Sequence, residues 1–288
     1  MSEARHFAAS PSSPLRNYAF SRDGLIRVAV GVALALSVCG VIYAGTIYLA
    51  LLVAVVALAA AREWHRMVGA GRYGDGLVVT TAAIWLALAA LVARPQGFVP
   101  EFVLLGGVLL QLALGLVWRR RLLWQAGGVL YLGLPALAII ALREVPANGA
   151  WLTLGLFIVV WATDTGALMA GKLIGGPKIA PVLSPNKTWA GTIGGVVLAS
   201  AMLALYIGLI GGGVAAAALF GAALAVAAHL GDLFESLVKR RFHTKDSGGL
   251  IPGHGGVLDR VDSTLSAALA LELAVFVFHV DPLFGARP

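Results

Sequence analysis

Residues 190 to 210 read AGTIGGVVLASAMLALYIGLI, and this stretch decides the class of fold. No charged side chain interrupts it. An α-helix needs about 20 apolar residues to cross the roughly 30 Å of hydrocarbon in a bilayer. The stretch therefore predicts a transmembrane helix.

Similar apolar runs recur along the whole chain of 288 residues, which is 59% hydrophobic and only 12% charged. A mean hydropathy of +0.89 excludes a soluble domain with one ordinary core. We predict an all-α, polytopic integral membrane protein with about nine transmembrane helices. Their expected ranges are 25–42, 44–61, 76–93, 98–117, 122–142, 150–170, 190–210, 213–232 and 264–281.

The basic residues give this topology an orientation, because short cytoplasmic loops hold most lysines and arginines. Nine spans with a cytoplasmic N-terminus place 18 of the 21 basic residues inside, and only Arg94, Arg143 and Arg287 outside. The net charge of +7 then lies at the cytoplasmic surface, where anionic lipid headgroups and nucleotides are found. We expect no nucleic-acid partner.

The chain is expected to form one membrane domain. Residues 1–24 are polar and contain Ser and Pro, which predicts a disordered cytoplasmic segment. We expect residues 25–288 to form a single transmembrane domain. Within it we expect residues 25–148 to supply scaffold helices and residues 149–288 the helices and cytoplasmic loops that carry the chemistry, since the polar clusters lie in the latter part.

The first polar cluster, WATDTGALMAGKLIGGPKIAPVLSPNKTWAG, covers residues 161–191. Asp164 lies inside the sixth span, where a charge is costly and is usually kept for function, although pairing with a neighbouring helix is the alternative. Ser184, Lys187 and Thr188 fall where the seventh helix is expected to start. Backbone N–H groups at a helix N-terminus favour phosphate.

Two further clusters carry acids at helical spacing. Asp232, Glu235 and Ser236 stand at i, i+3 and i+4 and so share one face of a helix. Asp259 and Asp262 repeat the i, i+3 spacing at the start of the ninth span. Oxygen ligands on two helix ends favour a hard cation such as Mg²⁺, which often shares its coordination with substrate phosphates.

The stretch SLVKRRFHTKDSGGLIPGHGGVLDRVD, residues 236–262, resembles the signature of the phosphatidate cytidylyltransferases. The upstream block TDTGA…GK…SPNKTW is similar to that family as well. The resemblance covers about residues 160–265. It implies transfer of the cytidylyl group of CTP to phosphatidic acid, giving CDP-diacylglycerol and pyrophosphate, the first committed step of phospholipid biosynthesis.

The chemistry of the side chains, together with the resemblance, which favours Asp232 and Asp259 as metal ligands, indicates roles for individual residues. Asp232 and Asp259 are expected to bind Mg²⁺, with or without a second cation, and Asp262 and Asp246 to ligate it or to orient basic groups. Lys187, Lys239, Lys245 and Arg260 would neutralise phosphates. The other expected substrate contacts are Asp164, Ser184, Thr188, Ser236, Arg240 and His254, the last of which alternatively shapes the Gly-Gly turn.

The same resemblance implies a multi-pass protein of the bacterial inner membrane or the plasma membrane, with its active site facing the cytoplasm. Its partners would be CTP, phosphatidic acid, membrane lipids and a second copy of the chain in a homodimer. Two alternatives stay open. A transporter also has intramembrane acids, but no inverted repeat is detected. A CTP-dependent kinase of an isoprenoid alcohol shares the membrane setting.

Overall fold

The computed structural model describes residues 22–69, 74–94, 97–118, 121–249 and 255–284. These residues form nine long α-helices, a two-stranded sheet and a short 3-10 helix. The helices are α2 (Arg22–Ala44), α3 (Thr46–Val68), α4 (Gly74–Ala93), α5 (Val99–Trp118), α6 (Leu122–Glu144), α7 (Gly149–Leu173), α8 (Trp189–Leu209), α9 (Val214–Arg241) and α10 (Leu258–Phe278). The strands are β1 (Lys178–Ala180) and β2 (Ser184–Thr188), and η1 is Asp281–Phe284.

The predicted all-α polytopic class is confirmed. Eight helices, α3 to α10, are long and apolar enough to cross a bilayer, and α2 contributes a shorter apolar part, Gly31–Ala44, among the described residues. The hydrocarbon core holds no water that could bond to backbone N–H and C=O groups. A single membrane-spanning segment can satisfy all of these groups by itself only as a helix. α8, with 21 residues, is about 31 Å long, close to the thickness to be crossed.

The chain divides after Gly40 into two compact units, residues 1–40 and 41–288. The structure describes the first unit only from Arg22 onwards, as the larger part of α2. The expected polar segment 1–24 lies almost wholly outside the described residues and stays a prediction. All the elements discussed below belong to the second unit.

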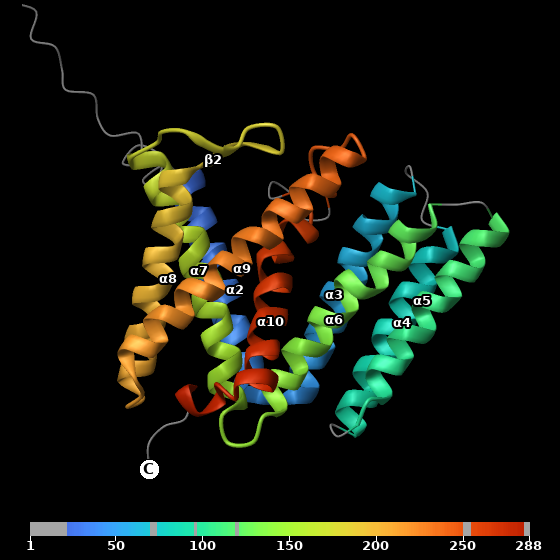
Figure 1. Ribbon diagram of the computed structural model, residues 1–288, viewed down its shortest axis with the longest axis horizontal. Coiled ribbons are helices and arrows are strands. Elements are labelled where there is room, and N and C mark those ends of the chain that lie inside the picture. Colours follow the sequence, from blue (N-terminus) through green and yellow to red (C-terminus); the bar gives the residue numbers. More distant parts are fainter. Residues whose placement is uncertain (1–21, 70–73, 95–96, 119–120, 250–254, 285–288) are drawn as a thin grey trace, which may run out of the picture. The chain divides into compact units, whose positions relative to one another are not determined.

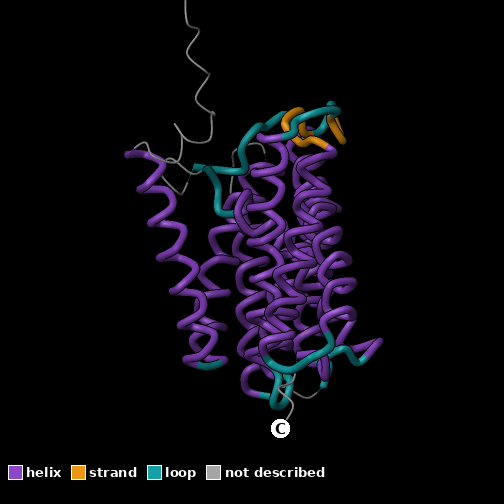
Figure 2. The backbone as a smooth tube through the Cα atoms, turned by 90° about the vertical axis from the view of Figure 1, so that its left-hand side faces the viewer, coloured by secondary structure: helices purple, strands orange, loops and turns teal. Residues whose placement is uncertain are grey.

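Two groups of helices make up the second unit. α3, α4, α5 and α6 pack against one another, and α7 packs against α8, α8 against α9 and α9 against α10. α10 also packs against α6 and so joins the two groups (Figure 1). Figure 2 shows these helices running side by side, with the sheet and several loops gathered at one end.

The helices that carry the polar clusters are longer than hydropathy predicted. α9 continues to Arg241, nine residues beyond the expected end, and α10 begins at Leu258 instead of 264. In the added turns of α9, Lys239 Nζ lies 2.6 Å from Glu235 Oε2, one turn apart. Such i, i+4 ion pairs stabilise a helix that leaves the apolar layer. The acids therefore lie on helices.

The loop between α7 and α8 contains an antiparallel hairpin that was not predicted. Ser184–Thr188 was expected at a helix N-terminus but forms strand β2, which pairs with β1 in the register Lys178 to Thr188 and Ala180 to Ser184. Pro185 is tolerated in this edge strand, because an edge strand leaves some of its N–H positions unpaired. Thr188 then caps α8, accepting a hydrogen bond from Gly191 N at 3.1 Å.

Candidate active site

The site lies where the C-terminal half of α9 crosses the N-terminal half of α10. Gly231 of α9 makes this crossing possible. A Cβ atom at position 231 would lie 2.2 Å from Ser266 Oγ and 2.7 Å from Asp262 O. A side chain there would push the helices apart, so Gly231 brings the neighbouring Asp232 close to Asp262.

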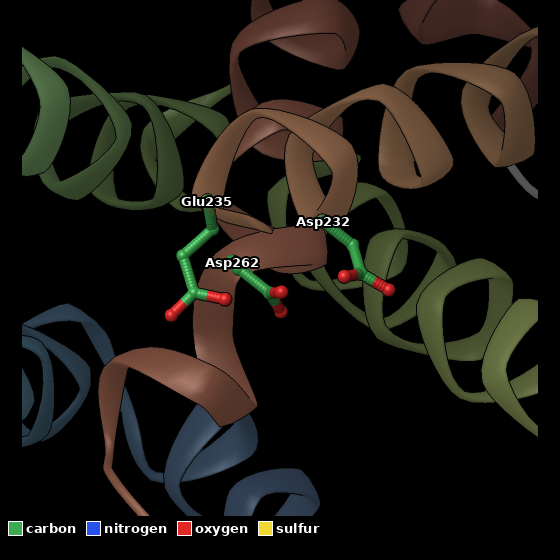
Figure 3. Close-up of side chains that lie close together, drawn as sticks. All are labelled: Asp232, Glu235 and Asp262. Atoms are coloured by element: carbon green, nitrogen blue, oxygen red, sulfur yellow. The ribbon is translucent and has the colours of Figure 1, made fainter. Parts of the chain in front are cut away.

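Three carboxylates converge at this crossing, Asp232 and Glu235 from α9 and Asp262 from α10. Each offers an oxygen atom within 4.8 Å of the others. Figure 3 shows the three side chains turned into the same space between the helices. Glu235 is only 1% exposed and Asp262 only 6%, whereas Asp232 is half-buried. We call these three residues the carboxylate cluster.

Two lysines border the carboxylate cluster on different sides. Lys187, from strand β2, places Nζ 2.5 Å from Asp232 Oδ2. Lys239, one turn after Glu235 on α9, places Nζ 2.6 Å from Glu235 Oε2 and 2.8 Å from Asp259 Oδ1. Lys239 thus joins Asp259 to the edge of the cluster.

Asp259 is also held by the loop that precedes α10. Its carboxylate accepts hydrogen bonds from Ser247 N at 3.2 Å and from Gly256 N at 3.0 Å. The three converging carboxylates include Asp232, as expected, but the other two are Glu235 and Asp262 instead of Asp259. Residue 259 lies in the first turn of α10 beside the loop, while residue 262 lies one turn further along, where α9 crosses.

The remaining expected residues on helices lie around this site. Asp164 lies on α7, which packs against both α9 and α10. Ser236 is buried on α9 beside Glu235. The structure therefore brings the sixth, eighth and ninth expected spans together at one place.

The other expected residues lie at the end of α9, in the hairpin and in the loop that follows α9. Arg240 Nε donates to Leu183 O at 3.1 Å and so fastens the hairpin that carries Ser184 and Lys187 to α9. Lys245 and Asp246 are exposed in the turn after α9. They are not among the three converging carboxylates or the lysines that border them. His254 falls outside the described residues.

Sequence reasoning missed one residue that contacts this region, Glu63 of α3. Glu63 is 2% exposed, and its Oε2 accepts hydrogen bonds from Ser247 Oγ at 3.0 Å and from Leu258 N at 2.8 Å. The expectation that residues 25–148 serve only as scaffold did not include such a contact. Glu63 is the one acid of α3, but it stands among Arg62, His65 and Arg66 near the end of the helix, so the sequence shows an ordinary polar helix end and no signal of this contact.

Glu272 lies on the same helix as Asp262 but away from the cluster. It lines an apolar cavity of about 530 Å³ between α6 and α10, together with Leu134, Leu269 and Phe276. Glu272 is therefore not one of the carboxylates that converge with Asp262.

The chemistry of the carboxylate cluster fits a hard divalent cation. Ion pairs join two lysines, Lys187 and Lys239, to three acids, Asp232, Glu235 and Asp259, and Asp262 adds a fourth acid. Glu235 Oε1 is buried and makes no hydrogen bond within the described residues. Buried carboxylates need a cation or donors, and oxygen ligands at this spacing suit Mg²⁺.

Comparison with known proteins identifies relatives of this chain. It is 44% identical over 173 residues to the phosphatidate cytidylyltransferase of Brucella abortus biovar 1 (strain 9-941), which is 59% of this chain and 63% of the relative. It is 41% identical over 150 residues to the phosphatidate cytidylyltransferase of Rickettsia bellii (strain RML369-C), and those residues make up 49% of this chain and 64% of the relative. The similarity thus spans less than two thirds of these relatives.

A match to a whole family extends further along the chain than these pairwise similarities. It covers residues 25–278, which include every helix from α3 to α10 and nearly all of α2. The residues that form the carboxylate cluster and its two bordering lysines all lie inside this range. The chain therefore belongs to the cytidylyltransferase family.

Proposed function

We propose that the protein transfers the cytidylyl group of CTP to phosphatidic acid, giving CDP-diacylglycerol and pyrophosphate. The observation that carries this proposal is the carboxylate cluster bordered by Lys187 and Lys239. Its acids suit a cation that binds phosphates, and its lysines suit the phosphates themselves. Relatives 41 to 46% identical to this chain are named phosphatidate cytidylyltransferase, which supports the choice of substrates.

Asp232, Glu235 and Asp262 would hold Mg²⁺, alone or with a second cation. A bound Mg²⁺ neutralises charge on phosphate oxygens and orients them for displacement. Asp259 has a different role in this proposal, because Lys239 and two backbone N–H groups already engage its carboxylate. We assign Asp259 to holding Lys239 and the preceding loop in place.

The chemical difficulty of the reaction is the repulsion between two anionic substrates. Lys187 and Lys239 are paired with the acids at 2.5 to 2.8 Å, so their charges are already positioned at the site. When a triphosphate binds, Lys187 can exchange part of its contact with Asp232 for a phosphate oxygen. Preorganised charges of this kind stabilise a transition state without reorganisation.

The reaction itself is one displacement at phosphorus. An oxygen of the phosphatidic acid monoester attacks the α-phosphorus of CTP, a new P–O bond forms, and the bond from the α-phosphorus to the bridging oxygen breaks to release pyrophosphate. A phosphate monoester has a second pKa of about 6, so its oxygen is largely deprotonated near neutral pH. The cluster acids therefore need not act as bases.

The lipid substrate requires a site at the membrane surface, which the position of the site on its helices supports. The cluster lies near the C-terminal end of α9 and the N-terminal end of α10, at the same end of the unit as the hairpin (Figure 1). We infer that this end faces the cytoplasm, where CTP is available, in the inner or plasma membrane. The homodimer implied by the family resemblance stays a prediction.

Turnover by the purified chain in detergent tests this function. With CTP labelled in the α-phosphate and phosphatidic acid, we expect labelled CDP-diacylglycerol, loss of activity with EDTA and recovery with Mg²⁺. Asp232→Asn is the matched inactive control. A second incubation, with a polyprenol and CTP labelled in the γ-phosphate, tests the kinase alternative. A kinase would transfer the label to the polyprenol. A folded chain that forms no CDP-diacylglycerol contradicts the proposal.

A further inference from the structure

We propose that Glu63 of α3 is a positioning residue for the reaction, because its carboxylate caps the N-terminus of α10 and sets where Asp259 and Asp262 stand. This inference rests on the proposed function for its kinetic consequences. Its structural basis is independent of the substrates. It consists of the contacts between Glu63 and a loop that lies 184 to 195 residues further along the chain.

The N-cap residue of α10 does not cap the helix with its own side chain. The N-cap residue is Val257, whose side chain cannot accept a hydrogen bond, and no side-chain cap is present there. The first N–H groups of a helix need acceptors from outside the helix, and the helix dipole favours a negative charge at that end. Glu63 Oε2 accepts from Leu258 N at 2.8 Å, and its charge adds to that of Asp259 in the first turn of α10.

The same oxygen also fixes the loop before α10. Glu63 Oε2 accepts from Ser247 Oγ at 3.0 Å, and Ser247 N donates to Asp259 at 3.2 Å. Asp259 in turn binds Lys239, which binds Glu235 of the carboxylate cluster. A short path of hydrogen bonds and ion pairs thus runs from α3 to the cluster.

Two glycines make room for the Glu63 carboxylate. A Cβ atom at position 248 would lie 2.3 Å from Glu63 Oε1, and one at position 256 would lie 2.6 Å from Glu63 Oε2 and 2.0 Å from Ser247 Oγ. Contacts below 3.0 Å force atoms to move. Positions 248 and 256 therefore need glycine, because the buried Glu63 carboxylate approaches the backbone closely at both.

Substitution of Glu63 tests the positioning role in the purified full-length chain. Glu63→Leu removes the acceptor, and we expect kcat to fall about 100-fold, as misplacement of reacting groups by about 1 Å can do. Glu63→Gln keeps an oxygen that accepts from Leu258 N and Ser247 Oγ, so kcat should stay within about tenfold of wild type. Equal losses in the two variants, or none in either, would overturn the inference.

Thr80→Val is the matched control for general damage to α3. Thr80 is fully buried and contacts His65 Nε2 of α3 at 2.8 Å, but the described contacts of Thr80 do not include the loop before α10. The variant should melt at a lower temperature than wild type and keep its kcat. If kcat of Thr80→Val were as low as that of Glu63→Leu, the loss in Glu63→Leu would reflect general destabilisation and not a positioning role of Glu63.

Neighbouring glycines give a second, independent test. Gly248→Ala should lower kcat as Glu63→Leu does, because the new methyl group displaces the carboxylate. Gly249→Ala should stay near wild type, because a Cβ there meets nothing within 4 Å. Similar losses for both alanines, or wild-type activity of Gly248→Ala, would contradict the inference.

Hydrogen exchange separates failure of this inference from failure of the proposed function. In the metal-free protein, the amides of Ser247, Gly256 and Leu258 should exchange faster in Glu63→Leu than in wild type and Glu63→Gln. This measurement needs no turnover. If wild type makes no CDP-diacylglycerol, the function is wrong, while unchanged exchange in Glu63→Leu would remove the role of Glu63.

Discussion

Asp262 and Glu235 are nearly fully buried acids that face Asp232 from two different helices. Their mutual repulsion acts in a low dielectric, where like charges cost more than in water. Lys239 offsets Glu235, and Asp262 Oδ1 accepts from Ser263 N at 2.7 Å. At the scale of single residues, the cluster concentrates negative charge, and a bound divalent cation would reduce the repulsion between its carboxylates.

Metal-dependent stability distinguishes the roles of Asp262 and Asp259. Mg²⁺ at about 100 times its Kd should stabilise wild type by about 2.7 kcal/mol, seen as a rise of the melting temperature in detergent. Asp262→Asn should lose that rise, because one ligand is gone. Asp259→Asn should keep most of it, because Asp259 is not one of the three converging carboxylates.

The metal-free melting temperature and the activity complete this comparison. Without Mg²⁺, Asp262→Asn should melt at or above the temperature of wild type, since a repelling charge is removed. Its kcat should fall by about 100-fold or more, the scale on which loss of one preorganised charged group is felt. A wild-type Mg²⁺ response in Asp262→Asn would exclude Asp262 as a ligand.

At the scale of elements, glycines determine how closely α7 and α8 approach. A Cβ at Gly194 of α8 would lie 2.2 Å from Ala170 Cβ of α7, and one at Gly166 of α7 would lie 2.5 Å from Gly194 O. Small residues let helices pack closely in membranes, where the hydrophobic effect does not drive helices together. This pair of helices carries Asp164 and borders the hairpin that holds Lys187.

Gly194→Ala should therefore destabilise the protein by about 1 to 3 kcal/mol, the usual cost of overpacking. Thermal unfolding in detergent measures this. Gly106→Ala on α5 is the matched control, because a Cβ there meets nothing within 4 Å. It should leave stability unchanged or slightly raised. Equal melting temperatures for the two variants would show that the α7 and α8 contact tolerates a larger separation.

At the scale of the whole molecule, the helices place the turn at residues 242–249 and the loop at residues 145–148 at opposite ends of their spans. α7 begins just after the loop at residues 145–148 and ends at the hairpin beside the site, and the turn directly follows α9. Because loops alternate between sides of the bilayer, the distribution of lysine and arginine predicts that the turn faces the cytoplasm and the loop at residues 145–148 the other side.

Labelling of single cysteines tests that orientation. Cys39 is the one cysteine of the chain, so Cys39→Ser gives a cysteine-free background. In that background, Asp246→Cys should react with a membrane-impermeant maleimide in inside-out vesicles but not in intact spheroplasts. Ala147→Cys should show the opposite pattern. Labelling of position 246 from outside the cell would reverse the topology.

The sequence by itself determined the class of fold and most of the helices. Uncharged runs such as residues 190–210 must be helical in hydrocarbon, whatever their neighbours, because their backbone groups have no other partners. The sequence also singled out the polar clusters that hold Asp232, Glu235 and Asp262, because charged groups in an apolar chain are conspicuous, but it named Asp232 and Asp259 as the expected metal ligands. It missed the hairpin and the full length of α9 and α10, which hydropathy does not report.

Only the tertiary structure decided which of these groups meet. Helical spacing relates Asp232 to Glu235 on one helix, but nothing local relates them to Asp262 or to Lys187 of strand β2. The relation to Asp262 depends on the close crossing at Gly231, and the relation to Lys187 depends on the hairpin, which Arg240 fastens to α9. The contact of Glu63 with Leu258 joins residues 195 positions apart. Spacing along a chain fixes neighbours within an element, whereas contacts between elements depend on how closely their surfaces can pack.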